Sequence, residues 1–427
     1  MKRVFELGED FAKRLDLEDP LKEIKNRFYI KEDEIYMDGN SLGLMSKDAE
    51  KTLMRVVEEW KNLGINGWMN AEMPWFYYPE ELGKLQAPLV GAEEDEVIIH
   101  SSTTVNLHSL VSTFFKPKGK RNKILMDSLT FPSDRYAIEG QLKLKDLDPR
   151  EHLVVIESKD GKTLDEREIV GRMDDDIALV LLPSVLYRSG QLLDIEYLTG
   201  QAHKRGIIIG FDCCHSVGAV PHYFSKWGVD FAFWCNYKYC NNGPGGTASI
   251  YVNKKHFHKE PVLAGWYGYI KEKQFDMSYE FQSAENAGAW QIGTSHMLSM
   301  APLEGSLKMF NEIGIEKIRE KSLKITDYLM YLIDNELSQY GFIIGNPRED
   351  HRRGGHVALE HEEAVRINEA MKDRGIVPDF RNPNVIRLAP VALYISYHDV
   401  WKVVSIIKDI MENEVYKNYS KKRGVVA

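Results

Sequence analysis

The chain has 427 residues, of which 43% are hydrophobic, so it is long enough to form a large domain and a smaller one around a sizeable core. The net charge is −9 and no basic block dominates, which leaves nucleic-acid binding with little support. The N-terminus lacks the continuous apolar core of a signal peptide, and apolar runs such as 177–182 are too short to cross a bilayer. We therefore expect a soluble, cytoplasmic protein that binds no membrane.

The first distinctive segment is 36–43, in which two glycines predict a turn with an unusual backbone. Ser46 can cap a helix over 47–63, where apolar residues recur on one face. An aromatic cluster follows, made of Trp68 and residues 75–78. Such a cluster is usually core or subunit interface, but it can also form the wall of a pocket for an aryl ring.

Two predicted strands are each followed by side chains that suit a cofactor. Residues 96–100 are predicted to form a short strand, and 101–104 begin an amphipathic helix. Hydroxyl residues at a helix N-terminus are ordinary caps, but the free N–H groups and the positive dipole end there also suit a phosphate. A second strand, 123–126, is followed by Phe131, which suits stacking on a flat ring or simple packing in a turn before Pro132.

Two buried strands near the middle of the chain end on polar side chains. The apolar run 207–211 stops at Asp212, and the run 229–234 leads to Tyr237 and Lys238. Short, fully apolar runs are typical of parallel strands, and ligands bind at the carboxyl ends of such strands in open α/β sheets. We therefore expect these side chains to meet at one site.

An acid and a lysine at neighbouring strand ends fit pyridoxal 5′-phosphate. This cofactor needs a lysine amine for a Schiff base and a carboxylate under its pyridine nitrogen, which keeps the ring protonated and electron-withdrawing. Burial beside a cationic ring would lower the pKa of Lys238 and so free its amine. The alternative is an ordinary ion pair between Asp212 and Lys238, but their order with His215, Tyr237 and a Gly-Pro-Gly-Gly turn favours the cofactor.

The cysteines do not suggest a metal site. All four of them, Cys213, Cys214, Cys235 and Cys240, lie around these two strand ends. No C-x-x-C pair is present, so zinc binding has no support. Free thiols packed as small core residues are the simpler interpretation, and they agree with a reducing compartment.

Several separate motifs lie along the chain: FDCCHSVGAVPHYFSKWGVDFAFWCNYKYCNNGPGG (211–246), DGNSLGL (38–44), TVNLH (104–108), FPSDRYAIE (131–139), GWYG (265–268) and RNPNVIRLAPVALY (381–394). In sequence and in order, these motifs resemble the kynureninase family of fold-type I pyridoxal-phosphate enzymes, which is related to class V aminotransferases. This resemblance extends over nearly the whole chain. It implies an α/β fold: a large domain with a mainly parallel, seven-stranded sheet flanked by helices, plus a smaller α+β domain.

The resemblance also divides the chain into three parts. Residues 1–45 would form an N-terminal segment that packs with the small domain and reaches the active site. Residues 46–300 would form the large cofactor-binding domain, and 301–427 the small C-terminal domain.

Roles for individual residues follow from the same resemblance. The chemistry would be carried by Lys238, Tyr237 and Asp212. The cofactor would contact Thr103, Thr104, Phe131, Pro132, Ser133, Asp134, Ser184, Asp212, His215, Tyr237, Lys238, Trp266 and Thr294. The substrate would contact Ser41, Trp68, Gly293 and Arg387, and no metal is implied. Whether Thr103 or Thr104 holds the phosphate stays open. Arg387 would bind the substrate α-carboxylate, although a lone arginine in a strand can also form a simple salt bridge.

The implied reaction is the hydrolysis of L-kynurenine to anthranilate and L-alanine in tryptophan catabolism, on the kynurenine pathway toward NAD biosynthesis. A large indole at Trp68 beside Gly293 suits an unhydroxylated ring, so we expect 3-hydroxykynurenine to be the poorer substrate. Trp266 and Thr294 would reach the site of a neighbouring subunit, which requires a homodimer. Tyr237 is a candidate acid–base group, with stacking or hydrogen bonding alone as the alternative.

Two other functions remain open on the sequence alone. The first is another class V enzyme, either an aminotransferase or a cysteine desulfurase, although a desulfurase needs a nucleophilic cysteine on a mobile loop. The second is a non-catalytic binding protein of the same fold, against which the complete set of Asp212, Tyr237, Lys238 and Arg387 argues. Release of anthranilate from kynurenine distinguishes these possibilities.

Overall fold

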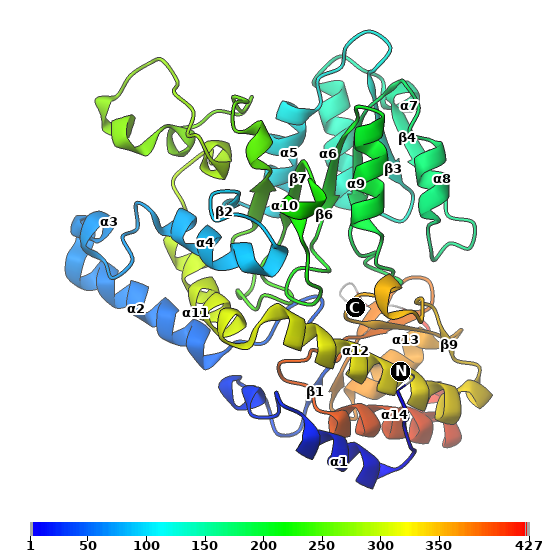
Figure 1. The fold of residues 1–427 in the computed structure, drawn as a ribbon. Coiled ribbons are helices and arrows are strands. Elements are labelled where there is room, and N and C mark those ends of the chain that lie inside the picture. Colours follow the sequence, from blue (N-terminus) through cyan, green and yellow to red (C-terminus); the bar gives the residue numbers. More distant parts are fainter. Residues whose placement is uncertain (1–2, 423, 425–427) are drawn as a thin grey trace.

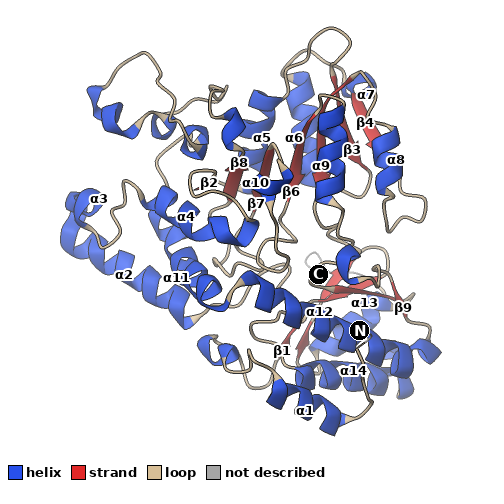
Figure 2. Ribbon diagram, viewed as in Figure 1, coloured by secondary structure: helices blue, strands red, loops and turns tan. Residues whose placement is uncertain are grey.

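Seven strands form one sheet in the computed structural model, which describes residues 3–422 and 424 (Figures 1 and 2). In spatial order the strands are β2 (Val97–Ile99), β8 (Ser249–Val252), β7 (Phe231–Trp234), β6 (Ile208–Asp212), β5 (Ile177–Pro183), β3 (Lys123–Asp127) and β4 (Leu153–Ile156). Within this sheet β8 alone pairs antiparallel with its neighbours, and the other pairs are parallel. The mainly parallel, seven-stranded sheet expected from the sequence is confirmed.

Both faces of the sheet are buried, because successive apolar residues of each strand point to opposite sides. In β7, Phe231 and Phe233 pack into one layer of the core, and Ala232 and Trp234 pack into the other. The helices of the first layer are α5 (Thr103–Phe114) and α6 (Pro132–Lys143), and those of the second are α4 (Tyr78–Val90), α9 (Ile195–Lys204) and α10 (Phe224–Trp227). The strand ends, where the polar side chains lie, are therefore the part of the sheet that a ligand can reach.

The helix predicted over 47–63 forms as α2 (Lys47–Leu63), and Ser46 caps it by accepting a hydrogen bond from the backbone N–H of Ala49. The apolar run at 207–211, predicted as a strand that ends at Asp212, forms as β6, and the run at 177–182 forms β5. The remaining helices of this part are α3 (Gly67–Asn70), α7 (Pro149–His152) and α8 (Glu166–Gly171). After β8 the chain forms an excursion of loops and short turns, at the upper left of Figure 1, before α11 (Met297–Ile313) returns to pack on α2.

The C-terminal part has a sheet of its own. Its antiparallel strands are, in spatial order, β12 (Asp379–Arg381), β13 (Val385–Leu388), β10 (Val357–Glu360) and β9 (Ile343–Ile344). Its helices are α12 (Ile315–Leu332), α13 (Ala364–Lys372) and α14 (Tyr397–Glu412).

The N-terminal segment lies against this C-terminal part. Helix α1 (Glu9–Glu18) packs on α14 (Figure 1), and β1 (Ile35–Tyr36) pairs in parallel with β11 (Ile376–Val377). Asp38 then forms a β-bridge with Ala389, so the first turn-forming segment is delivered to the end of β13. We retain the division of the chain at 45 and 300 as a proposal.

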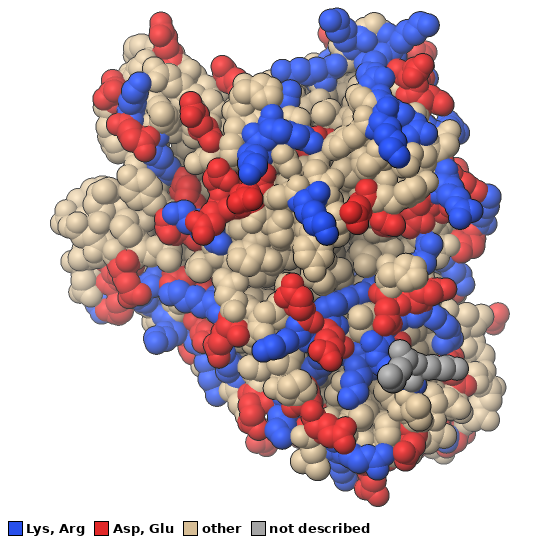
Figure 3. Space-filling model, in the orientation of Figure 1, with Lys and Arg blue, Asp and Glu red and all other residues tan. Residues whose placement is uncertain are grey.

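The surface carries charges of both signs. Figure 3 shows lysine, arginine, aspartate and glutamate interspersed over the face that it views, whereas the bulge over α3, at the left, has few of them. Three apolar side chains at this end of the molecule are exposed: Trp60, Ile65 and Met69. Every helix in the described part of the chain is too short or too polar to span a bilayer.

Candidate active site

A cavity of about 430 Å³ lies beyond the ends of β6 and β7, where the large sheet, the C-terminal sheet and the N-terminal segment meet. Its lining residues are Asn40, Ser41, Ser102, Thr103, Thr104, Phe131, Ser133, Asp134, Tyr187, Asp212, Cys214, His215, Tyr237, Lys238, Gly245, Gly246, Arg381 and Arg387. A larger, open cavity of about 1040 Å³ shares none of these residues. The smaller one is the candidate active site, because it brings together the lysine, the acid and the arginine that the sequence singled out.

Lys238 is held inside this cavity by His215. The ε-amino nitrogen of Lys238 lies 2.9 Å from Nε2 of His215, and the pKa of His215 is lowered well below its usual value, first by burial and then by the charge of Lys238. A neutral imidazole can accept the hydrogen bond that the lysine donates. Burial also acts to lower the pKa of Lys238, as expected. Three acidic neighbours, Cys235, Cys214 and Asp212, act the other way and leave that pKa raised.

Two buried carboxyl groups meet at the other side of the cavity. Asp212 Oδ1 accepts a hydrogen bond from the backbone N–H of Cys214 at 2.8 Å, and Asp134 lies beside it at the start of α6. The pKa of Asp134 is raised well above its usual value, by burial and then by the charge of Asp212. A cationic ring nitrogen placed here would relieve this repulsion, so the acid pair fits the pyridine nitrogen of pyridoxal phosphate.

The start of α5 offers an anion site on the same cavity. Ser102 is the N-cap residue but makes no side-chain cap hydrogen bond, and its hydroxyl and those of Thr103 and Thr104 border the cavity. The first N–H groups of a helix lack intrahelical acceptors and favour a phosphate. Gly245 and Gly246 bring bare backbone to the same cavity. These groups fit the phosphate of the cofactor, with either threonine able to contribute.

Phe131 provides the flat surface on which the ring of the cofactor can stack. Its side chain is 43% exposed within the site, and its ring meets that of Tyr187 edge to face at 5.3 Å. His215 supplies one more unsatisfied group, because its Nδ1 is buried and has no partner among the described residues. Taken together, the residues of this cavity fit pyridoxal phosphate.

Arg387 and Ser41 lie at the far end of the cavity, contributed by β13 and by the N-terminal segment. Nη2 of Arg387 donates to Ser41 Oγ at 2.9 Å, and Nη1 donates to the backbone carbonyl of Tyr187 at 2.8 Å. Nε of Arg387 donates to Asp379, which is directly opposite on β12. Both arginine and aspartate are almost completely buried, so this is not a surface salt bridge.

The segment that carries Ser41 passes between both parts of the molecule. The N–H of Gly43 donates to the carbonyl of Tyr237 at 2.8 Å, next to Lys238. A Cβ on Gly43 would collide with the carbonyl of Lys238, and a Cβ on Gly39 would collide with Tyr394. Neither glycine has a positive φ, so the expected unusual backbone is wrong. These glycines are needed because other groups approach the chain closely.

Several predicted site residues do not border this cavity. Ser184 lies behind Asp212, where its hydroxyl donates to the Asp212 carbonyl at 3.1 Å and meets Ser216 Oγ at 2.7 Å. Pro132 borders a neighbouring cavity of about 280 Å³. Four others lie elsewhere on the single chain: Trp68, Trp266, Gly293 and Thr294. Trp68 packs edge to face on Trp75, with ring centres 6.0 Å apart.

The sequence reasoning also missed residues that do border the cavity. Tyr187 lies three residues after Ser184, and Arg381 begins the RNPNVIRLAPVALY motif, but the sequence analysis predicts no role for either residue. Arg381 lies two residues after Asp379 on β12, and the period of two in a strand puts both on the face that carries Arg387. That spacing was the available signal. Asn40 stands beside Ser41 in the DGNSLGL motif, but no role was predicted for it; it reaches the cavity because the N-terminal segment docks there.

Solved structures of similar fold define the class of this protein. A cysteine desulfurase from Thermococcus onnurineus NA1 aligns with a TM-score of 0.76 at 19% identity, over 92% of this chain and 98% of that one. A variant of C-DES with glycine covalently linked to its PLP cofactor aligns with a TM-score of 0.78 at 14% identity, over 90% and 99% of the two chains. The chain therefore has the fold of these proteins, which is the fold of fold-type I pyridoxal-phosphate enzymes.

Sequence relatives narrow the class to one family. A kynureninase from Geobacillus thermodenitrificans is 60% identical over 418 residues, 98% of each chain, and one from Bacillus mycoides is 58% identical over 426 residues, 100% of each chain. A kynureninase from Shouchella clausii is 56% identical over 418 residues. The family model described as the kynureninase C-terminal domain matches residues 318–407. The chain belongs to the kynureninase family.

Proposed function

We propose that this protein binds pyridoxal 5′-phosphate in the cavity at β6 and β7 and hydrolyses L-kynurenine to anthranilate and L-alanine. The observation that carries the proposal is that Lys238, Asp212 and Arg387 border one cavity, in a chain at least 56% identical to three kynureninases over most of its length. When bound, the cofactor supplies an electron sink for charge that develops at the substrate Cα. The residues of the chain provide the binding and the proton transfers.

Lys238 is proposed to hold the cofactor and then to move the proton at the substrate Cα. The neutral His215 keeps the amine in place through its 2.9 Å hydrogen bond. Asp212, fixed by the N–H of Cys214, provides the negative charge for the cofactor's ring nitrogen. Phe131 supports the ring, and the N-terminus of α5 holds the phosphate.

Tyr237 is proposed as the acid for the bond cleavage. Its pKa is raised, first by Cys235 and then by burial, so the phenol is protonated at neutral pH. It borders the cavity next to Lys238, where it can donate a proton at the ketone oxygen or at Cβ. Water adds to the aryl ketone and the Cβ–Cγ bond breaks, which gives the carboxylate of anthranilate and, after protonation at Cβ, alanine.

The direct test is to incubate the purified protein with the cofactor and L-kynurenine and to record anthranilate fluorescence. Turnover supports the proposal, and its absence in a cofactor-loaded protein refutes it. Lys238→Ala is expected to abolish turnover and the visible absorbance of lysine-bound cofactor. Lys204→Ala, at an exposed site near the end of α9, is the matched control and is expected to keep both.

We further propose that the active enzyme is a homodimer, to whose neighbouring site Trp266 and Thr294 contribute. Both side chains are exposed on the single chain, and further exposed apolar residues lie over the sparsely charged bulge in Figure 3. Mixing inactive Lys238→Ala with impaired Trp266→Ala tests the shared site. A mixed dimer holds one site with both side chains intact, so activity should recover on mixing; no recovery would contradict this arrangement.

Two finer proposals complete this assignment. Kynurenine is proposed to be a better substrate than its 3-hydroxy analogue, because a large indole at Trp68 beside Gly293 suits an unhydroxylated ring. Parallel assays with the reverse order of kcat/KM would refute this. The cytoplasm is the proposed location, supported by four buried free thiols.

The burial of these four cysteines argues against the desulfurase alternative, because a desulfurase needs an accessible cysteine. The structural likeness to desulfurases concerns the fold alone.

A further inference from the structure

Three of the five N–H groups of Arg387 are already engaged within the protein. A side-on pair uses two parallel N–H groups of one guanidinium, one of them on Nε. In this structure Nε is occupied by Asp379, and Nη1 donates to the carbonyl of Tyr187 at 2.8 Å. Nη2 donates to Ser41 Oγ at 2.9 Å, and both residues border the cavity. The side-on pair is thus blocked at Nε, so a second donor from another residue would strengthen the binding of a carboxylate.

Arg381 stands where that donor is required. It borders the same cavity, and its Nη2 lies 3.5 Å from Ser41 Oγ. Two guanidinium groups on neighbouring strands thus converge on one hydroxyl oxygen. That oxygen marks a position at which both N–H groups can meet a negatively charged acceptor.

Asp379 sets the spacing of the two arginines. It is 3% exposed, and Arg381 pairs with it through Nε at 3.0 Å and through Nη2 at 3.0 Å. Asp379 also accepts from Nε of Arg387, its direct partner across β12 and β13. One carboxylate therefore serves two guanidinium groups, so these three side chains carry one positive charge more than negative charges. This surplus attracts an anion while the neighbouring Asp38 carboxyl group is protonated.

We infer that Arg381 is a second substrate-binding residue, which holds the substrate α-carboxylate jointly with Arg387 at the position marked by Ser41 Oγ. Asp379 is the positioning residue for both. This inference rests on the proposed function, since it concerns how an amino-acid substrate is bound. It assigns carboxylate recognition to a pair of arginines rather than to Arg387 alone, and it makes Arg381 a determinant of specificity for amino acids over their amides.

The experiment compares two ligands that differ only in the carboxylate. Cofactor-loaded enzyme is titrated with L-alanine and with L-alaninamide, and the visible absorbance of the cofactor reports binding. Arg381→Met should weaken L-alanine binding at least about tenfold, because a charge-assisted hydrogen bond is lost, and should leave L-alaninamide binding unchanged. Arg381→Lys should recover part of the preference for L-alanine over L-alaninamide, because lysine keeps the positive charge but lacks the paired N–H groups of the guanidinium. KM for kynurenine should rise more than kcat falls.

Arg374→Met is the matched control, since Arg374 is also half-exposed in the C-terminal part and pairs only with the exposed Asp409 in the described chain. It should leave the preference for L-alanine intact. Arg381 is about one-third exposed, so its variants are expected to fold, and thermal unfolding checks this. If Arg381→Met keeps the preference within twofold, the inference is overturned while the proposed function stands. If the unmodified enzyme releases no anthranilate, the proposed function itself fails.

Discussion

The ε-amino nitrogen of Lys238 lies 2.9 Å from Nε2 of His215, and the imidazole is neutral because burial and the neighbouring positive charges lower its pKa. The lysine therefore donates to an acceptor that carries no charge of its own. This arrangement holds the amine in place without an ion pair, which would keep it protonated more strongly. The hydrogen bond to His215 thus positions the amine, while the acidic neighbours Cys235, Cys214 and Asp212 keep its pKa raised.

Replacing His215 with phenylalanine keeps a flat ring but removes the acceptor. We expect kcat/KM for kynurenine to fall roughly 10- to 100-fold, which corresponds to the loss of a hydrogen bond to a charged group. The pH dependence of the visible absorbance should shift as well, since the amine loses its partner. His258→Phe, at an exposed position, should leave both unchanged. An unaltered kcat/KM in His215→Phe would show that the imidazole does not position the amine.

Gly43 joins the N-terminal segment to the loop that carries Lys238. In Gly43→Ala, the added methyl group would collide with the carbonyl of Lys238 and with Asn241. We expect a loss of about 1–3 kcal/mol in stability, as for other overpacked sites, and a larger loss of activity because Ser41 is displaced. Gly171→Ala at the end of α8 meets open space and should be neutral in thermal unfolding and in kcat/KM. If Gly43→Ala and Gly171→Ala had the same stability and the same kcat/KM, the close approach of Lys238 to Gly43 would not be what requires a glycine there.

The sequence predicted the parts of the site that follow buried strands. Asp212 and Lys238 could be placed because a short apolar run that stops at a polar residue is a strong signal for a parallel strand and its end. The same reasoning placed Ser46 at a helix start, where local chemistry determines the outcome. In each case the signal is contained within a few residues of the chain.

The contacts between distant segments could not be predicted in this way. The grip of Asp379 on both Arg381 and Arg387 depends on the register of β12 against β13, which no local pattern specifies. Likewise, Gly43 meets Lys238 only because the N-terminal segment is tied to the C-terminal part first. Trp266 and Thr294 lie outside the cavity on this chain, and no local pattern in the sequence predicts that separation.

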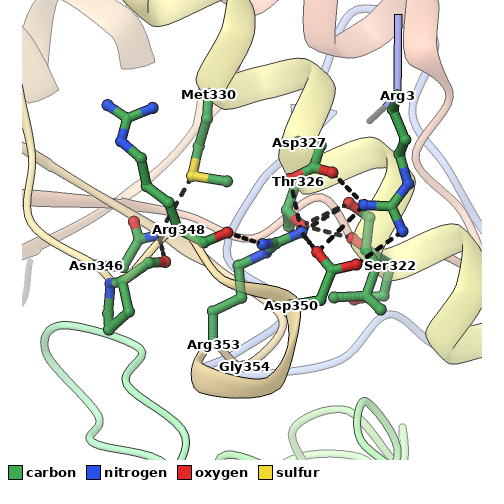
Figure 4. Close-up of polar contacts among 12 residues, drawn as sticks. Arg3, Ser322, Thr326, Asp327, Met330, Asn346, Arg348, Asp350, Arg353 and Gly354 are labelled. Carbon is green, nitrogen blue, oxygen red and sulfur yellow. Dashed lines mark hydrogen bonds and ion pairs between the residues drawn. The ribbon is translucent and has the colours of Figure 1, made fainter. Parts of the chain in front are cut away.

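Arg353 anchors the loop after β9, and its guanidinium is completely buried (Figure 4). It forms ion pairs with Asp327 and Asp350, each at 2.7 Å, and Arg3 from the N-terminal segment pairs with the same two acids. Arg353→Met should cost about 1–3 kcal/mol, because the carbonyls of Arg348 and Leu323 lose their donor while both acids keep Arg3. Arg348→Met, beside it in Figure 4, breaks an exposed pair with Asp334 and should cost at most about 1 kcal/mol.

Thermal unfolding of both variants measures this difference. The prediction would fail if Arg348→Met lowered the melting temperature as much as Arg353→Met. A second measurement concerns the junction with the large sheet, because the carbonyl of Arg352 accepts from the N–H of Leu192 at 2.9 Å. Loss of the anchor is expected to increase hydrogen exchange at Leu192, and Arg348→Met should not change it.

Asp38 makes carboxylate binding depend on pH. Burial, and then the charge of Asp379, raise the pKa of Asp38 to about 6, and one of its carboxylate oxygens has no partner among the described residues. Below pH 6 Asp38 is neutral, so the surplus positive charge of Arg381 and Arg387 over Asp379 is preserved. Above pH 6 Asp38 ionises and cancels that surplus. The affinity for the α-carboxylate should therefore fall as pH rises through about 6.

Asp38→Asn tests this dependence, because an amide copies the neutral carboxyl group and does not titrate. The ratio of L-alanine to L-alaninamide affinity should fall between pH 5 and pH 8 in the unmodified enzyme, by roughly three- to tenfold for one nearby charge in a partly screened site. In Asp38→Asn the ratio should stay level across the same range, since the amide cannot ionise. Superimposable profiles for the two proteins would show that another group controls the binding of the carboxylate, and a ratio that rises with pH would contradict the sign of the coupling.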